Sequence, residues 1–124
     1  MSVHYSEQLL KLIAMNFQKL QCAPLPKNAL PLTMEVENTF FSSIPEGWQI
    51  DRKKGPHRLS RQFIFGDFNE SVAFINKVAI IANEEGHHPD IKIEYNKVTL
   101  ELWTHDIEGL SENDFILASK ISAI

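Results

Sequence analysis

The stretch 68–85 constrains the fold most, because it is the longest amphipathic pattern in the chain and strand-like segments lie on both sides of it. Apolar residues recur along it at the spacing of a helix that buries one face. This stripe is formed by Phe68, Val72, Ile75, Ala79 and Ala82, and is widened by Val78 and Ile81. Gly86 suits the left-handed residue that ends a helix, and Pro89 blocks its continuation. The pattern predicts a helix from about 68 to 85.

Alternating apolar and polar residues predict two strands before this helix. Trp48 and Ile50 alternate with polar neighbours, and 59–65 forms a second alternating run beyond a turn at 53–56. Arg61 interrupts the alternation of the second run, so the sequence leaves open which of its faces is buried.

Two more strands and a final helix are predicted after the long helix. Ile91, Ile93 and Tyr95 share one strand face, and a tight turn near 96–97 leads to a strand that buries Val98, Leu100 and Leu102. The last helix starts at Ser111, and Asp114 takes the Glu or Gln place of a capping box. Its apolar stripe comprises Leu117, Ile121 and Ile124.

The N-terminal third reads as two short helices separated by prolines. Segment 6–20 is amphipathic and can be capped by Ser6, and 33–43 forms a second short helix. The complete order predicts an α+β fold, an antiparallel four-stranded sheet with helices packed on one face, whose edge strands can pair between subunits. We expect an N-terminal extension with a Pro-rich linker over 1–31 and the domain itself over 32–124.

Charge and cysteine content exclude several classes of function. The net charge of −4 argues against direct nucleic-acid binding and against attraction to anionic membranes, and no apolar run is long enough to span a bilayer. Cys22 is the only cysteine, so an intrachain disulfide and a cysteine-based zinc site are both excluded. No secretory signal is recognisable at the N-terminus, and we expect a cytoplasmic location.

Histidines are the residues with most potential for chemistry. His87 and His88 follow the negative end of the long helix, where Glu84 and Glu85 add charge that favours the imidazolium form and hence proton donation. His105 ends the strand 97–103 and can meet the pair across the hairpin. On local grounds alone, however, a His-His pair after a helix is more often a solvated cap than a catalyst.

Purely structural roles for the other candidate residues also stay open. Asp114 is explained by helix capping, and Trp48 and Trp103 are more often core or interface residues than ligand stackers. His4 and His57 read as surface residues in a terminus and a turn. Three histidines can suggest zinc, but adjacent histidines are awkward as two ligands of one ion, so we expect no metal.

Several of these residues together resemble the pterin-4a-carbinolamine dehydratases. The resemblance rests on Glu85-Gly86-His87-His88-Pro89-Asp90, Tyr95-Asn96-Lys97-Val98, Trp103-Thr104-His105 and the run 109–118, with Asp114 in register. It covers 46–124 well, and the segment from Cys22 to the Pro-Leu-Thr at 31–33 is similar to the longer N-terminal region of prokaryotic and plastid-type members. The helix 6–20 has no match in this resemblance.

The resemblance implies dehydration of a 4a-hydroxytetrahydropterin to a quinonoid dihydropterin without metal or redox cofactor. By the same resemblance His87 and His105 are acid or base, and His88 binds and orients the pterin and can share in the acid/base catalysis. Asp114 orients a histidine or completes the site. Trp48 and Trp103 are weaker candidates for the pocket wall. Family members form dimers and tetramers, so we expect a homodimer or homotetramer.

One departure from the family pattern keeps alternatives open. Asn83 stands where the family often has an acidic residue, and it can hold a histidine or pterin by hydrogen bonds but cannot supply charge. Glu84 can substitute for that carboxylate after a small shift. The alternatives are a pterin-binding protein for another, molybdopterin-related pterin, and a protein-interaction module like the mammalian relatives that act as a dimerisation cofactor of a transcription factor.

Overall fold

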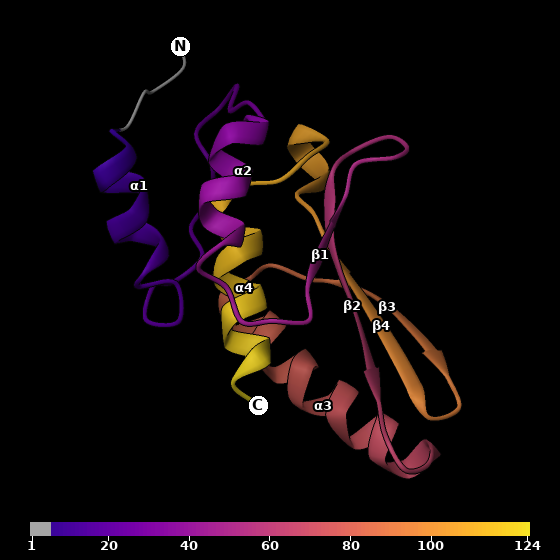
Figure 1. Cartoon of the computed structure of the whole chain (residues 1–124). Coiled ribbons are helices and arrows are strands. Elements are labelled where there is room, and N and C mark those ends of the chain that lie inside the picture. The colour runs from indigo at the N-terminus through magenta and orange to yellow at the C-terminus, as the bar shows by residue number, and fades with distance from the viewer. Residues whose placement is uncertain (1–5) are drawn as a thin grey trace.

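The computed structural model describes residues 6–124 and shows helices gathered on one side of an open sheet (Figure 1). The elements in chain order are α1 (Glu7–Ala14), α2 (Met34–Phe41), β1 (Gln49–Asp51), β2 (Arg58–Ile64), α3 (Phe68–Glu85), β3 (Asp90–Glu94), β4 (Lys97–Leu102), the 3-10 turn η1 (His105–Ile107) and α4 (Glu112–Ser122). All strand pairs are antiparallel and the strand order is β1-β2-β4-β3. The predicted α+β fold is therefore confirmed.

The core lies between the central strand β4 and the helices. Val98, Leu100 and Leu102 are fully buried, as their alternation predicts. Helix α4 is buried nearly all round, although its sequence predicts only one apolar stripe, and Ile124 at the end of that stripe is 45% exposed. A helix enclosed on several sides is not revealed by periodicity, because its neighbours come from distant parts of the chain.

The N-terminal segment packs into the same core. Helix α1 is shorter than the predicted 6–20, and Ser6 Oγ caps it by accepting a hydrogen bond from the Leu9 N–H at 3.1 Å. Beyond it Phe17 is almost fully buried, edge-on to Phe40 of α2 and stacked against Phe115 of α4. The boundary at residue 31 stays a prediction, but Phe17 shows that residues before it contribute to the core.

Arg61 explains the broken alternation of β2. Its guanidinium carbon lies 4.4 Å from the ring centroid of Phe63 and 5.9 Å from that of Trp48. Its Nη1 donates a hydrogen bond to Ser122 Oγ at 3.2 Å. The long stem can therefore lie along aromatic surface while the charge is hydrogen-bonded. Arg61 thus lies on the aromatic, helix-side face of β2.

The C-terminus of α3 sets the direction of the chain towards the histidines. Gly86 adopts a left-handed conformation with φ 65°, as its position after the long helix predicts. The His87 N–H then donates to the Ala82 carbonyl at 3.2 Å, which closes the helix end. The chain turns through Pro89 into β3, so the histidine pair is fixed where α3 meets the sheet. None of the helices over residues 6–124 is long and apolar enough to cross a membrane.

Candidate functional site

A buried carboxylate holds His87. The His87 Nε2 atom lies 2.6 Å from Asp114 Oδ1, and Asp114 is completely buried while the His87 side chain is 13% exposed. A carboxylate accepts hydrogen bonds, so Nε2 carries the proton and Nδ1 is left to exchange one with a ligand. The pair joins the end of α3 to the start of α4.

Asp114 is itself held by two further donors. Its Oδ2 accepts a hydrogen bond from the Thr104 hydroxyl at 2.8 Å and from the Ser111 N–H at 2.9 Å. The Thr104 and Ser111 hydroxyls lie 2.7 Å apart. The sequence predicted the capping contact to Ser111. Charge-assisted bonds from several directions give this carboxylate one fixed orientation.

His88 points to a different partner, as expected for adjacent residues. Its Nε2 lies 2.9 Å from Asn83 Oδ1 on the last turn of α3, and both residues are exposed. Asn83 therefore orients His88 by a neutral hydrogen bond. Glu84 is exposed on the same turn and its carboxylate does not take the place of Asn83.

His105 is the first residue of η1, three residues beyond the end of β4. Its ring stacks on Trp103 with centroids 3.9 Å apart and planes at 24°. Trp103 Nε1–H donates to Asp90 Oδ2 at 2.9 Å, and His105 Nε2 lies 3.9 Å from Asp90 Oδ1. His105 is therefore held beside Asp90, two residues after His88.

One open cavity of about 240 Å³ brings the three histidines together. It is lined by Gly86, His87, His88, Trp103, Thr104, His105 and Asp106. The Asp114 carboxylate contacts His87, and the Asn83 amide contacts His88. Each of these two residues therefore holds one of the histidines that line the cavity.

Trp48 is not part of this group. It is 3% exposed, and its Nε1–H donates to Ser122 Oγ at the C-terminal end of α4 at 2.8 Å. The structure places it in the core with Phe63, so it does not line the cavity of the histidines.

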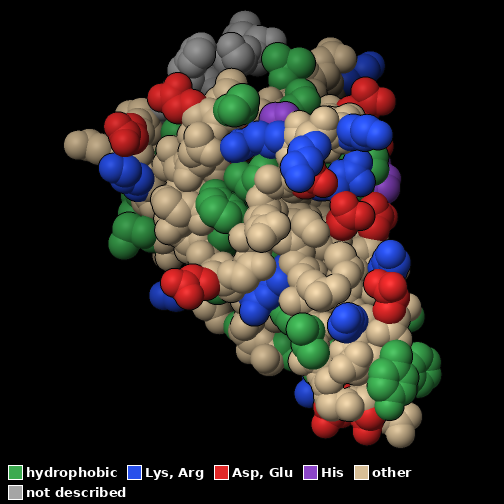
Figure 2. Space-filling model, turned by 45° about the vertical axis from the view of Figure 1, so that its right-hand side comes forward, with side chains coloured by type: hydrophobic (Ala, Val, Ile, Leu, Met, Phe, Trp, Pro, Cys, Tyr) green, Lys and Arg blue, Asp and Glu red, His purple; other side chains and the backbone are tan. Residues whose placement is uncertain are grey.

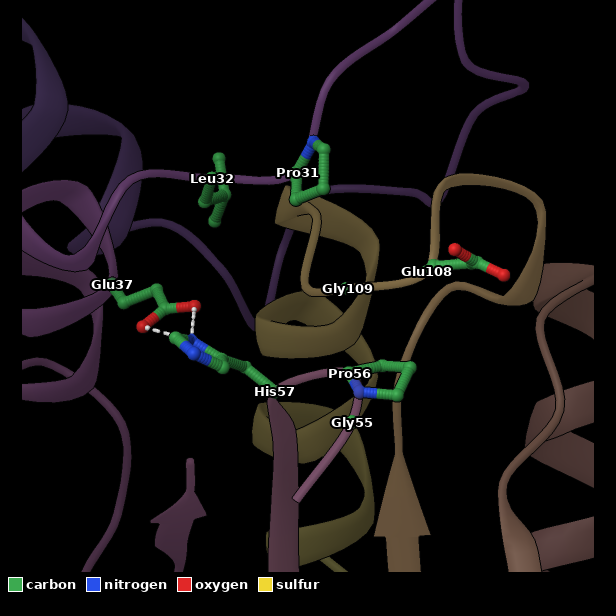
Figure 3. Close-up of a pocket in the computed structure, with 8 residues that line it drawn as sticks. All are labelled: Pro31, Leu32, Glu37, Gly55, Pro56, His57, Glu108 and Gly109. Atoms are coloured by element: carbon green, nitrogen blue, oxygen red, sulfur yellow. Dashed lines mark hydrogen bonds and ion pairs between the residues drawn. The ribbon is translucent and has the colours of Figure 1, made fainter. Parts of the chain in front are cut away.

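A larger cavity of about 430 Å³ lies between α2, the turn before β2 and the 108–109 turn (Figure 3). There His57 Nδ1 contacts both carboxylate oxygens of buried Glu37, at 2.9 and 3.1 Å, and Arg52 Nε donates to the same carboxylate at 3.0 Å. His57 is thus half-buried in an ion-pair network and is not the plain surface residue that its turn suggested. No local signal reveals this, because Glu37 lies twenty positions earlier on another element.

Two supporting residues of the histidine site were missed from the sequence. Thr104 and Asp90 lie inside the motifs that carry the resemblance, but their side-chain partners depend on strand register. Glu85, which was considered only as local charge, accepts a hydrogen bond from the Cys22 N–H at 2.8 Å. Over residues 6–124 there is no group of three His, Cys, Asp or Glu side chains that could hold a metal ion.

The environment of Cys22 makes its thiol unreactive. Burial, with Glu85 close by, raises its pKa to about 12 from an ordinary value of 9.0. Only the thiolate attacks disulfide reagents. At pH 8 we expect the folded protein to react with a chromogenic disulfide reagent at least tenfold more slowly than the same protein unfolded in urea. Equal rates, after correction with a small free thiol in both buffers, would contradict the burial of this thiol.

Comparison with known proteins finds relatives that match most of this chain. The family described as "Pterin 4 alpha carbinolamine dehydratase" matches residues 31–124. A Marinobacter nauticus protein named "Putative pterin-4-alpha-carbinolamine dehydratase" is 41% identical over 105 residues, which are 85% of this chain and 94% of that protein. A protein of the same name from Nitrosomonas eutropha is 38% identical over 104 residues, covering 84% of this chain and 88% of its own.

Two solved structures are similar to this one. The first is a transcriptional coactivator/pterin dehydratase from Brucella melitensis, with a TM-score of 0.68, 31% identity, and coverage of 75% of this chain and 96% of that one. The second is a pterin dehydratase-like protein identified as a RuBisCO assembly factor in the alpha-carboxysome, with a TM-score of 0.53, 25% identity, and coverage of 63% and 88%. From the family match and these relatives, the chain belongs to the pterin 4 alpha carbinolamine dehydratase family.

Proposed function

We propose that this protein catalyses dehydration of a 4a-hydroxytetrahydropterin by histidine acid/base catalysis. The observation that carries the proposal is the 2.6 Å contact of His87 with buried Asp114, in a cavity that His105 also lines. Family membership supports dehydration as the reaction class, and the cavity offers two imidazoles where the reaction needs an acid and a base.

The reaction requires two proton movements. The bond from C4a to the hydroxyl oxygen breaks, and an acid protonates that oxygen so that water leaves. The proton on N5 goes to a base, and the freed electron pair forms the double bond between N5 and C4a. Imidazole suits both steps because its ordinary pKa is roughly 6.5, and each such transfer is worth about 100- to 10,000-fold in rate.

The roles follow from how each histidine is held. His87 has Nε2 fixed by Asp114, so its Nδ1 is the atom that exchanges a proton. His105, which lines the same cavity, is the second acid or base. His88 is fixed by Asn83 through a neutral bond, which suits binding and orienting the pterin.

The test is the dehydration rate of the wild-type protein. A carbinolamine is generated in situ by a hydroxylase, and formation of the quinonoid product is followed by absorbance. We expect the protein to accelerate the reaction well above the spontaneous rate. Pterin binding without any acceleration would overturn the enzymatic proposal.

The second candidate is a pterin-binding or protein-interaction module with little dehydratase activity. It is favoured by the likeness to the pterin dehydratase-like assembly factor, together with Asn83 at a place where the family often has an acid. A transcriptional coactivator-type role or a molybdopterin-related ligand belongs to this candidate. A cytoplasmic location and the absence of direct nucleic-acid binding stay predictions.

We also propose that the protein forms a homodimer or homotetramer through the outer edge of β3. Within residues 6–124 this strand pairs with β4 alone, and it carries Ile91 and Ile93, which are 41% and 37% exposed. Hydrophobic side chains also gather at the lower end of the face in Figure 2. Tyr95, in the turn between β3 and β4, is 65% exposed. An unpaired apolar edge is a template for pairing with a second copy.

Light scattering on a sizing column tests the oligomer. The wild type is expected to elute as a dimer or tetramer, and Ile93→Lys is expected to shift it towards monomer. Leu12→Lys places the same charge on an exposed apolar position of α1 and is expected to leave the mass unchanged. A monomeric wild type would contradict the proposal.

A further inference from the structure

His105 raises a problem of orientation. Its side chain is 57% exposed, whereas the other acid/base candidate, His87, is 13% exposed and bound to a buried carboxylate. An exposed imidazole is free to turn between rotamers, and an acid or base that is misplaced by about 1 Å can lose on the order of 100-fold in rate. Some contact must therefore hold its ring in the cavity.

The contacts of His105 lead to Asp90. The His105 ring stacks on Trp103 at 3.9 Å between centroids, and Trp103 Nε1–H donates to Asp90 Oδ2 at 2.9 Å. The other oxygen, Asp90 Oδ1, lies 3.9 Å from His105 Nε2. One carboxylate thus contacts the indole and faces the imidazole, so it fixes the surface on which His105 rests.

The Asp90–Trp103 platform is itself anchored. Asp90 is the first residue of β3 and pairs in register with Glu101 of β4, which brings its carboxylate to the end of β4. The Arg58 guanidinium carbon lies 5.1 Å from the Trp103 ring centroid, and Arg58 Nη1 lies 3.4 Å from Glu101 Oε2. Beyond Trp103, the bridge between Thr104 and Gly109 closes the turn that carries His105.

We propose that Asp90 is a positioning residue, which holds His105 over the cavity through the Trp103 indole and through its own charge. The inference rests on the proposed function, in which His105 moves a proton. It assigns roles to Asp90 and Trp103 in addition to those of the three histidines and Asp114. Trp103 then acts as the support of an acid/base group, because the His105 ring stacks on its indole.

A purely structural role gives a different expectation. If the Asp90 contact only tied β3 to the end of β4, its loss would lower stability and leave the ring of His105 where it is. The position of that ring is therefore the decisive measurement. Stacking on an indole shifts the His105 ring protons upfield in the NMR spectrum and gives cross-relaxation with the Trp103 ring. Both signals are independent of catalysis.

The experiment compares Asp90→Ala, Asp90→Asn and Trp103→Phe with the wild type. In Asp90→Ala we expect loss of the upfield shift and of the His105–Trp103 cross-peaks, faster solvent exchange of one of the two indole N–H signals, and a kcat about tenfold lower with KM within about twofold. Asp90→Asn keeps an acceptor for the indole and is expected to restore the ring contact and part of kcat. Trp103→Phe keeps an aromatic ring but loses the donor, and is expected to weaken the contact as Asp90→Ala does.

Glu94→Gln is the matched control, because Glu94 is an exposed carboxylate on the same strand that faces Lys92 at 3.6 Å. It should leave both the ring signals and the kinetics unchanged. An unchanged upfield shift in folded Asp90→Ala overturns the inference, whatever its activity. A wild type without dehydration contradicts the proposed function alone, and the ring signals then still decide on Asp90.

Discussion

His87→Ala is expected to lower the dehydration rate of the pterin carbinolamine by about 100-fold or more, with the fold intact. The reason is that the variant removes the imidazole whose Nε2 is fixed by Asp114 at 2.6 Å, and a positioned acid or base contributes on the order of 100- to 10,000-fold. Stopped-flow absorbance of the quinonoid product measures the rate, and circular dichroism checks the fold.

The matched variant is His105→Ala, which removes the second acid/base group that lines the cavity. It is expected to lose most of the rate as well, with a smaller effect on stability because His105 is more exposed than His87. Added imidazole should restore part of the rate in both variants, since the deleted ring leaves a space. If both purified variants matched the wild type, the assignment of the site would be wrong.

Asp114→Ala is expected to reduce both stability and activity. Two donors, the Thr104 hydroxyl and the Ser111 N–H, lose their shared acceptor in a fully buried place, and each unsatisfied buried donor costs about 1–3 kcal/mol. We therefore expect the free energy of unfolding to fall by about 3 kcal/mol in urea titrations. Activity should fall too, because His87 loses the group that fixes its tautomer.

Asp114→Asn separates the two effects. The amide keeps one oxygen acceptor and nearly the same volume, so most of the stability is expected to return. It presents a neutral group to His87, and the rate is expected to remain low. Asp106→Asn, at an exposed position near the same turn, is the control for unfolding and should change the free energy by less than about 0.5 kcal/mol. Wild-type stability in Asp114→Ala would contradict the burial and bonding of this carboxylate.

The predicted buried stripe of α3 was wrong at Phe68 and Val72, which are 48% and 36% exposed, because the helix buries the face that carries Ser71, Phe74, Val78 and Ala82. The bounds of α3 and the buried face of β4, with Val98, Leu100 and Leu102, were predicted well. These features are local, because a helix end or a strand face depends on residues a few positions apart. Segments shaped by distant partners were predicted less well, such as the early end of α1, where Phe17 turns towards Phe40 and Phe115.

The same division applies to the site. The sequence by itself determined which side chains are available and their spacing, including the end of α3 that delivers His87 and His88 side by side. Only the tertiary structure decided what each histidine touches. The partner of His87 lies 27 positions away on α4, and the support of His105 depends on the register of β3 against β4. From local sequence alone, the His-His run reads as a solvated helix end. Packing places the buried Asp114 carboxylate against the His87 ring. The orientation of that ring and its proton exchange depend on this contact, which local sequence does not encode.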